Sequence, residues 1–164
     1  MNDARIAYTQ NKTDQGDTMV GYKRILVAVD LGEHSRQVIG RAQAASAKAG
    51  ATVKLLHVVE YVPVEPMGEA LLPAVSVEED LVAGARKRLT DLAEHCGLEA
   101  VEAEVLAGPI KSEICHQASQ WGADLIVLGS RGRHGLGALV NLTEDAVLHG
   151  APCDVLAVRL QDQA

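Results

Sequence analysis

The sequence predicts an α/β fold, a single doubly wound domain in which a parallel β-sheet is covered by helices on both faces. Three observations support this prediction. Short continuous apolar runs rich in Val, Ile and Leu recur along the chain, as in strands buried on both sides. Segments with apolar residues at helical spacing lie between those runs. Finally, 164 residues with 48% hydrophobic and 23% charged side chains suffice for one domain with a sizeable core.

The ends of the chain are expected to lie outside this domain. Residues 1–18 are polar and show no periodicity, so residues 1–21 are expected to form a flexible N-terminal extension. Met19 stands just before the first apolar run, and translation from it would yield the domain without the extension. The domain is then expected to span residues 22–160, with residues 161–164 as a tail.

The first half of the domain alternates between strands and helices. Residues 25–29 are an apolar run that predicts a strand, and residues 35–48 have helical spacing. A second strand is expected over residues 52–58. The Pro- and Glu-containing residues 59–74 are too many for a tight turn and predict an exposed loop. A capping box over residues 76–79 predicts the start of a long helix that ends at Gly97, with an apolar face made by Leu81, Val82, Ala85, Leu89, Leu92, Ala93 and Cys96.

The second half continues the alternation. Residues 101–106 predict a third strand, and Gly108 and Pro109 predict a helix with the proline at its first position. Residues 124–128 predict a fourth strand, residues 143–149 a short helix and residues 155–158 a fifth strand. Strands that alternate with helices in this way are typical of a parallel sheet with helices on both faces.

Composition excludes several kinds of protein. Asp and Glu number 22 against 15 Lys and Arg, giving a charge of −7, and there are three Tyr, one Trp and no Phe. Binding of nucleic acid usually needs a basic face or aromatic stacking surfaces, so no nucleic acid partner is expected. No apolar run reaches about 18 residues and no signal sequence is recognisable, so we expect a cytoplasmic protein with no membrane association.

The cysteines and histidines show no pattern of a redox or metal site. Cys96, Cys115 and Cys153 are widely spaced without C-x-x-C, which favours a packing role as reduced thiols over redox chemistry. The six histidines lack the spacing of metal ligands, so no metal site is expected.

A glycine-rich segment directly follows the fourth strand, over residues 129–137. Glycines allow backbone N–H groups to converge on an anion, and neighbouring Ser and Arg side chains add donors and charge. The segment therefore predicts either a phosphate-binding loop or an ordinary tight turn. Its candidate ligand-binding residues are Gly129, Ser130, Arg131, Gly132, Arg133 and Gly135.

A polar residue also ends the first strand. Ligands of parallel sheets bind beyond the carboxyl ends of the strands, where the strand order reverses. Asp30 is placed to accept hydrogen bonds from a base or ribose, or else to cap the loop that follows it. His57 is either a packed residue near the end of the second strand or part of the adenine side of a site.

Several segments together resemble the universal stress protein family. They are ILVAVD ending at Asp30, VKLLHV ending at Val58, the Gly108–Pro109 helix start, ADLIVLGSRG over residues 123–132 and APCDVLAV over residues 151–158. The resemblance covers residues 22–160 and implies an adenine-nucleotide alpha-hydrolase-like fold of five parallel strands in the order 3-2-1-4-5. Strands one and four would then be neighbours. It also implies a cytoplasmic stress-response role and a homodimer built partly by the last strand, over residues 155–160.

The same resemblance implies a nucleotide site in those members that bind ATP, which carry G-x-x-G and, about nine residues later, G-[ST]. Gly129 and Gly132 match the first half, with Val29, Asp30, His57 and Val58 at the neighbouring strand ends. The second half reads Asn141-Leu142 before Thr143. Asn tolerates the left-handed turn of a glycine, whereas Leu lacks the hydroxyl. Thr143 either supplies that hydroxyl or is the N-cap of the next helix.

Charge at the start of the short helix enters the functional prediction. Glu144 and Asp145 suit the helix dipole without a ligand, and they would repel bound phosphates unless Arg131, Arg133 and Mg²⁺ offset them. The favoured function is a regulatory module that binds ATP and contacts an unidentified protein partner. The alternative is a stress protein that acts through homodimerisation and protein contacts without nucleotide.

An enzyme is the least favoured function. Residues 31–35 read LGEHS and contain neither S-G-G-x-D-S nor H-x-G-H, the motifs expected after the first strand of related nucleotide-using enzymes. His134 and Glu144 are the local candidates for a base, so at most a weak ATPase activity is expected.

Overall fold

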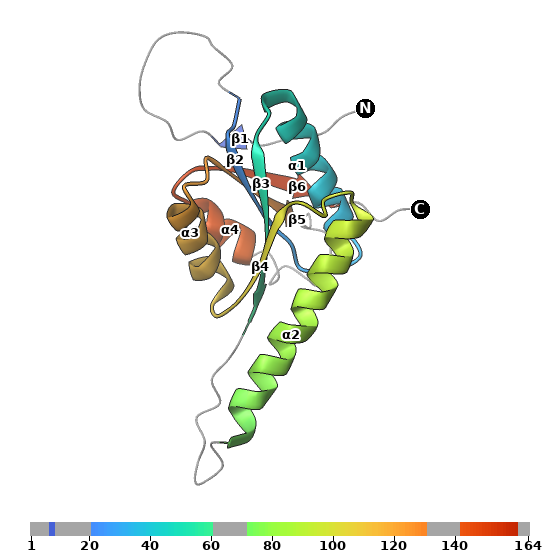
Figure 1. The fold of residues 1–164 in the computed structure, drawn as a ribbon. Helices are drawn as coiled ribbons and strands as arrows, with labels where there is room; N and C mark the ends of the chain where they lie inside the picture. Colours follow the sequence, from blue (N-terminus) through green and yellow to red (C-terminus); the bar gives the residue numbers. More distant parts are fainter. Residues whose placement is uncertain (1–6, 9–20, 61–71, 131–141, 161–164) are drawn as a thin grey trace.

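The computed structural model describes residues 7–8, 21–60, 72–130 and 142–160 (Figure 1). The predicted loop over residues 59–74 and the glycine-rich segment therefore lie largely outside the described residues. The elements follow in the order β1 (Ala7–Tyr8), β2 (Arg24–Ala28), α1 (Ser35–Ala49), β3 (Thr52–Val59), α2 (Leu72–His95), β4 (Glu102–Ala107), α3 (Ile110–Trp121), β5 (Leu125–Ser130), α4 (Leu142–Gly150) and β6 (Asp154–Arg159).

The sheet confirms the predicted strand order. Its order is β1-β6-β5-β2-β3-β4, and the strands β2 to β6 are parallel to one another. Counted from β2, the parallel strands stand in the order 3-2-1-4-5. The chain runs from β2 to one side through β3 and β4, and then returns to the other side through β5 and β6. The strand order therefore reverses between β2 and β5.

The strand β1 is a departure from the prediction, because residues 1–21 were expected to form no regular structure. It pairs antiparallel with β6, with Ala7 opposite Leu156 and Tyr8 opposite Val155. The outer edge of an edge strand offers unpaired backbone groups, and these bind another segment through the main chain whatever its side chains are. Apolar periodicity, the signal used to find strands, does not reveal such a segment.

Two hydrophobic clusters, one on each face of the sheet, form the core. In β2, Ile25 and Val27 belong to the cluster with α1 and α2, whereas Leu26 belongs to the cluster with α3 and α4, and all three are fully buried. Figure 1 shows α1 and α2 on one side of the sheet and α3 and α4 on the other. Successive side chains of a strand point to opposite faces, so burial on both faces explains the continuous apolar runs.

The helix α2 differs from the prediction at its start. It begins at Leu72, so Ser76 lies inside the helix and the capping box does not mark its first turn. Pro73 is compatible with this earlier start, because proline is tolerated in the first turn of a helix. Leu81 was expected to face the core but is 52% exposed. Figure 1 shows the first half of α2 extending beyond the sheet, where no strand lies beneath it.

Glycines end the helices as predicted for Gly97, and two others act in the same way. Gly50 follows α1 and Gly122 follows α3, both in the left-handed conformation that favours glycine. Pro109 is the N-cap of α3 and not its first helical residue, one position from the prediction. No helix in the described part of the chain is long and apolar enough to cross a membrane.

Candidate functional site

The carboxyl ends of β2 and β5 lie side by side at the point where the strand order reverses. Ala28 and Leu128 are the last residues at which the two strands pair with each other. Asp30 and Ser130 each follow two residues later, at the same edge of the sheet. We call Val29, Asp30, His57, Gly129 and Ser130 the strand-end site. The sequence predicted all five, and the topology brings them to this edge.

Asp30 orients the loop between β2 and α1. Its Oδ1 accepts hydrogen bonds from the Gly32 N–H at 2.9 Å and from the Ser35 hydroxyl at 3.0 Å. Leu31 between them has a φ of 59°, in the left-handed region that a tight turn needs. The structure therefore confirms that Asp30 caps the following loop. Its predicted role toward a base or ribose stays a prediction.

Two residues that hold this loop were not predicted from the sequence. Ser35, which is 1% exposed, donates to Asp30 from the first residue of α1. Ser35 follows Asp30 within the same short loop, with Gly32 between them, so this contact could have been predicted from the sequence. Arg88 of α2 donates from Nη2 to the Leu31 carbonyl oxygen at 2.8 Å. No sequence pattern indicates that contact, because the two residues are far apart in the chain.

His57 packs against the end of β2. Its Nδ1 lies 2.8 Å from the Val29 carbonyl oxygen. A carbonyl oxygen only accepts, so Nδ1 carries the hydrogen and, in the neutral ring, Nε2 carries the lone pair. His57 is half-buried within β3 and pairs in register with Val105. These contacts agree with the packed-strand interpretation of this histidine.

The two predicted valines contribute their side chains to the core. Val29 is 7% exposed and packs with the α1 and α2 cluster, and Val58 is 8% exposed and packs with the α3 and α4 cluster. The Val29 N–H donates to the Leu56 carbonyl oxygen at 2.9 Å, while its carbonyl oxygen accepts from His57. Val29 therefore fixes the ends of β2 and β3 relative to each other.

The first glycine of the glycine-rich segment has a packing role. Gly129 lies in β5, where a Cβ atom would stand 3.1 Å from Leu160 Cδ1 and 3.3 Å from Val38 Cγ2. These distances are shorter than most carbon contacts, so a larger residue would push Leu160 and Val38 outward, and the packing favours glycine whether or not a ligand binds. The next residue, Ser130, ends the strand and accepts the Leu160 N–H at its carbonyl oxygen.

The other predicted phosphate-binding residues are only partly described. Arg131, Gly132, Arg133, Gly135 and Asn141 lie outside the described residues, and their roles stay predictions. The backbone of α4 begins at Leu142, which places Thr143 inside the helix and not at its N-cap. Glu144 and Asp145 fall in the first turn of α4, as expected.

Buried charge gathers elsewhere, toward the amino ends of the strands. Lys54 of β3 is 4% exposed, and its Nζ lies 2.7 Å from Glu102 Oε1 and 2.7 Å from Glu104 Oε2. The same Nζ is 6.0 Å from the centroid of the Trp121 ring. Burial alone would lower the pKa of Lys54, but the hydrogen bonds and the charges of the two glutamates together outweigh burial and raise that pKa.

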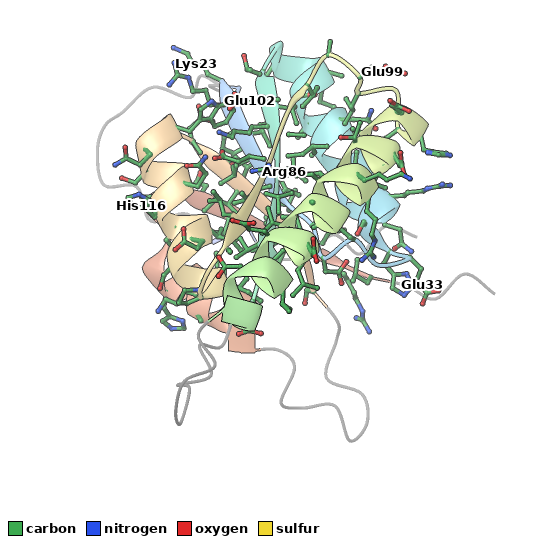
Figure 2. The ribbon with its side chains drawn as sticks, turned by 60° about the horizontal axis from the view of Figure 1, so that its bottom comes forward. Lys23, Glu33, Arg86, Glu99, Glu102 and His116 are labelled. Carbon is green, nitrogen blue, oxygen red and sulfur yellow. The ribbon has the colours of Figure 1, made fainter. Side chains whose placement is uncertain are left out.

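The arrangement at the amino ends also involves backbone groups. Asp124 accepts from the Lys23 N–H at 2.7 Å and the Arg24 N–H at 3.0 Å, and Arg24 Nη1 donates to the Trp121 carbonyl oxygen at 2.8 Å. We call Arg24, Lys54, Trp121, Asp124 and the Glu102–Glu104 pair the amino-end cluster. Figure 2 shows Lys23 and Glu99 at one end of the molecule and Glu33, from the loop after β2, at the other.

Among the described residues, the cysteines show no sign of reactivity, and no group of side chains forms a metal site. Burial raises the pKa of all three thiols, and for Cys153 the pKa reaches about 11 with the help of the Asp154 and Asp124 charges. Reactive cysteines need the opposite shift. Within the described ranges, no three His, Cys, Asp or Glu side chains are grouped to hold a metal ion. A groove of about 340 Å³ lies between α2 and β4, far along the sheet from β5.

Comparison with known proteins places these features in a family. The model of the universal stress protein family matches residues 21–159. The chain is 41% identical to universal stress protein A homolog 2 of Coxiella burnetii over 87% of its length and 99% of that protein. It is 39% identical to homolog 1 of the same organism, over 86% of its length and 99% of that protein.

Solved structures show the same fold. The universal stress protein UspA of Lactobacillus plantarum superposes with a TM-score of 0.66 at 28% identity, over 84% of this chain and 98% of that one. A universal stress protein in complex with cAMP superposes with a TM-score of 0.60 at 20% identity, over 86% of this chain and 99% of that one. The extent of these matches, together with the strand order, shows that the chain belongs to the universal stress protein family.

Proposed function

We propose that this protein is a regulatory module that binds an adenine nucleotide, ATP with Mg²⁺ foremost, at the strand-end site. The observation that carries the proposal is the juxtaposition of the β2 and β5 carboxyl ends at the reversal of strand order, with the Asp30 carboxylate oriented there by Gly32 and Ser35. Parallel sheets bind ligands at this place because strand ends and helix starts converge on it.

Charge and hydrogen-bonding capacity favour a nucleotide over other small ligands. The Asp30 carboxylate accepts hydrogen bonds from ribose hydroxyls or a base amine. Ser130 and the glycine-rich segment that follows it, with Arg131 and Arg133, suit phosphates. A family member of the same fold is known in complex with cAMP, which contains the same base and ribose. We assign the site a binding role in the cytoplasm and no catalytic step.

A second candidate is a protein that acts without nucleotide, through a homodimer along β6 and contacts with a protein partner. Specific observations favour it. Gly129 is explained by its packing against Leu160 and Val38, and Asp30 by its hydrogen bonds within the loop, so neither requires a ligand. Leu142 lacks the hydroxyl expected at its position. Glu144 would place a repelling negative charge next to the predicted phosphates.

Calorimetry and thermal unfolding with 1 mM ATP and Mg²⁺ separate the two candidates. A ligand present at 100 times its Kd stabilises the folded state by about 2.7 kcal/mol, which raises the melting temperature by about 5–10 °C in a domain of this size. Replacing Asp30 with alanine removes an acceptor at the site, and we expect at least a tenfold loss of affinity, about 1.4 kcal/mol.

Glu99→Ala is the matched control, because Glu99 is an exposed carboxylate at the opposite end of the molecule (Figure 2). It should leave the affinity unchanged. AMP and cyclic AMP tested in parallel show which phosphates matter. If a folded sample gave neither heat nor a melting shift with any of the three nucleotides, the nucleotide proposal would be wrong and the dimer candidate would stand.

A further inference from the structure

The outermost parallel strand, β6, pairs with a short segment that lies outside the residues matched by the family model. The family model matches from residue 21, whereas β1 consists of Ala7 and Tyr8. This two-residue strand is the neighbour of β6 on the side away from β5. Pairing over two residues leaves most of the six residues of β6 without a strand partner on that side among the described residues.

The backbone of β6 shows which residues face this outer edge. The Leu160 N–H donates to the Ser130 carbonyl oxygen in β5, so the backbone of Leu160 faces inward. Backbone groups of successive residues in a strand point to opposite sides. Val155, Ala157 and Arg159 therefore present their N–H and C=O groups to the outer edge, where Tyr8 is the register partner of Val155.

The polarity of β1 indicates what else fits this edge. It runs antiparallel to β6. A second copy of β6, related to the first by a two-fold axis perpendicular to the sheet, is antiparallel to it by symmetry and presents the same outward groups. The place that β1 occupies is thus the place that the β6 strand of a second copy would take in the homodimer proposed above.

We propose that β1 is an intramolecular cap that competes with a second copy of this chain for the outer edge of β6. The inference rests on the proposed homodimer along β6 and deepens it. Because β1 and β6 belong to the same chain, their pairing is intramolecular, and the effective concentration of such a segment is on the order of millimolar. The cap therefore opposes dimerisation at micromolar protein concentration, and its release opens the edge.

The cap acts on dimerisation twice, because both chains must be open before their β6 strands pair. The apparent Kd then rises as the inverse square of the open fraction, so an open fraction of about one third weakens the dimer about ninefold. Removing residues 1–18 is expected to lower the dimer Kd by about tenfold or more. Sedimentation velocity from 1 to about 100 µM protein measures this change.

Two proline variants of the full chain form a matched pair. Tyr8→Pro removes the N–H that faces β6 and should reproduce the effect of the truncation. Ala7→Pro alters the neighbouring residue, whose N–H faces away from β6, and should change the Kd less. Equal effects of the two substitutions would contradict the assigned pairing of Tyr8 with Val155.

The opposite strand is tested in the truncated chain. Ala157→Pro removes an outward N–H while leaving the inward hydrogen bonds to β5 in place, and it should return the truncated protein to a monomer. Arg159→Pro serves the same purpose at an exposed residue if the first variant does not fold. Val158→Asp is unsuitable, because Val158 is 7% exposed in the core and a charge there would unfold the domain.

The outcomes separate the cap from the dimer. Equal dimerisation of full and truncated chains would overturn the cap while the homodimer stood. A truncated chain that stays monomeric at 100 µM would overturn both. A dimer lost on truncation would also overturn the cap, since β1 of one chain would then pair with β6 of its partner. Nucleotide affinity, measured on the same samples, tests the ligand proposal separately.

Discussion

The two ends of the parallel strands are held in different ways. At the strand-end site, Asp30 accepts from residues two and five positions further along the chain. In the amino-end cluster, Lys54 pairs with Glu102 and Glu104, and Asp124 accepts from the backbone of Lys23 and Arg24, about a hundred positions away. The side-chain contacts of Asp30 are local, although Arg88 of α2 also holds this loop, whereas the contacts of the amino-end cluster join distant elements.

This difference separates contacts that join distant strands and helices from contacts that orient a single loop. Each polar group of the amino-end cluster joins one strand or helix to another, so its loss weakens the sheet. At the strand-end site, Asp30 orients one loop, so its replacement is expected to leave the core intact, whereas Val29 and Gly129 also pack against the core. A buried charged residue is a common sign of a functional site. Here the most buried lysine among the described residues, Lys54, lies in the amino-end cluster, where its contacts hold strands together.

The largest expected effect is on stability and comes from Lys54→Met. The substitution keeps much of the side-chain volume but leaves Glu102 and Glu104 facing each other without a cation. Removing one partner of a buried ion pair costs about 3–5 kcal/mol, and the partial exposure of both glutamates reduces this to about 2–3 kcal/mol. Urea unfolding measures the loss, and Lys48→Met on the exposed side of α1 is the matched control.

Nucleotide affinity should stay unchanged in Lys54→Met, and an altered affinity with unaltered stability would reverse the proposed division between the two ends.

The sign of the pH dependence of stability follows from the raised pKa of Lys54. Its contribution to stability is complete below the ordinary lysine pKa of 10.5 and is lost as the pH rises above that value.

A smaller effect is expected from Gly129→Ala at the strand-end site. The added Cβ would press on Leu160 and Val38, and overpacking of this kind costs about 1–2 kcal/mol. The loss should appear in thermal unfolding without any nucleotide. Leu160→Ala in the same chain should recover part of it, because the nearest atoms are removed. A variant as stable as the parent, yet unable to bind nucleotide, would show that the glycine serves the ligand and not the packing.

Local patterns in the sequence predicted most of the fold and suggested where a site would lie. The apolar run ending at Asp30 and the run before Gly129 were enough to locate two strand ends. Their adjacency came from the family resemblance, because no local pattern sets the order of parallel strands. The loop cap was one of two roles that the sequence left open for Asp30, and its partner Ser35 was missed although the spacing was visible.

Contacts between distant segments were beyond the reach of these patterns. Lys54 looked like one polar residue in an apolar strand, since its partners Glu102 and Glu104 lie on a strand formed much later in the chain. β1 was missed because edge pairing uses backbone groups that every residue has. The capping box over residues 76–79 misplaced the start of α2, because α2 begins at Leu72 and Ser76 already lies inside it.

The smallest expected effect tests the amino-end cluster through Cys153, which directly precedes β6. Burial and the charges of Asp154 and Asp124 raise its pKa from 9.0 to about 11. A raised pKa means that the protonated thiol stabilises the fold fully below pH 9 and that this contribution is lost as the pH approaches 11. Two pKa units correspond to about 2.7 kcal/mol, and because Cys153 is only half-buried the fall in stability between these pH values should be smaller in Cys153→Ala than in the parent by about 1 kcal/mol. Alkylation by iodoacetamide at pH 8 gives a second readout, since about a hundredfold less thiolate is present at a pKa of 11 than at 9. Fast alkylation of Cys153 in the folded protein would mean that Asp154 and Asp124 do not act on this thiol, and that the amino end of the sheet is more open to solvent than its contacts indicate.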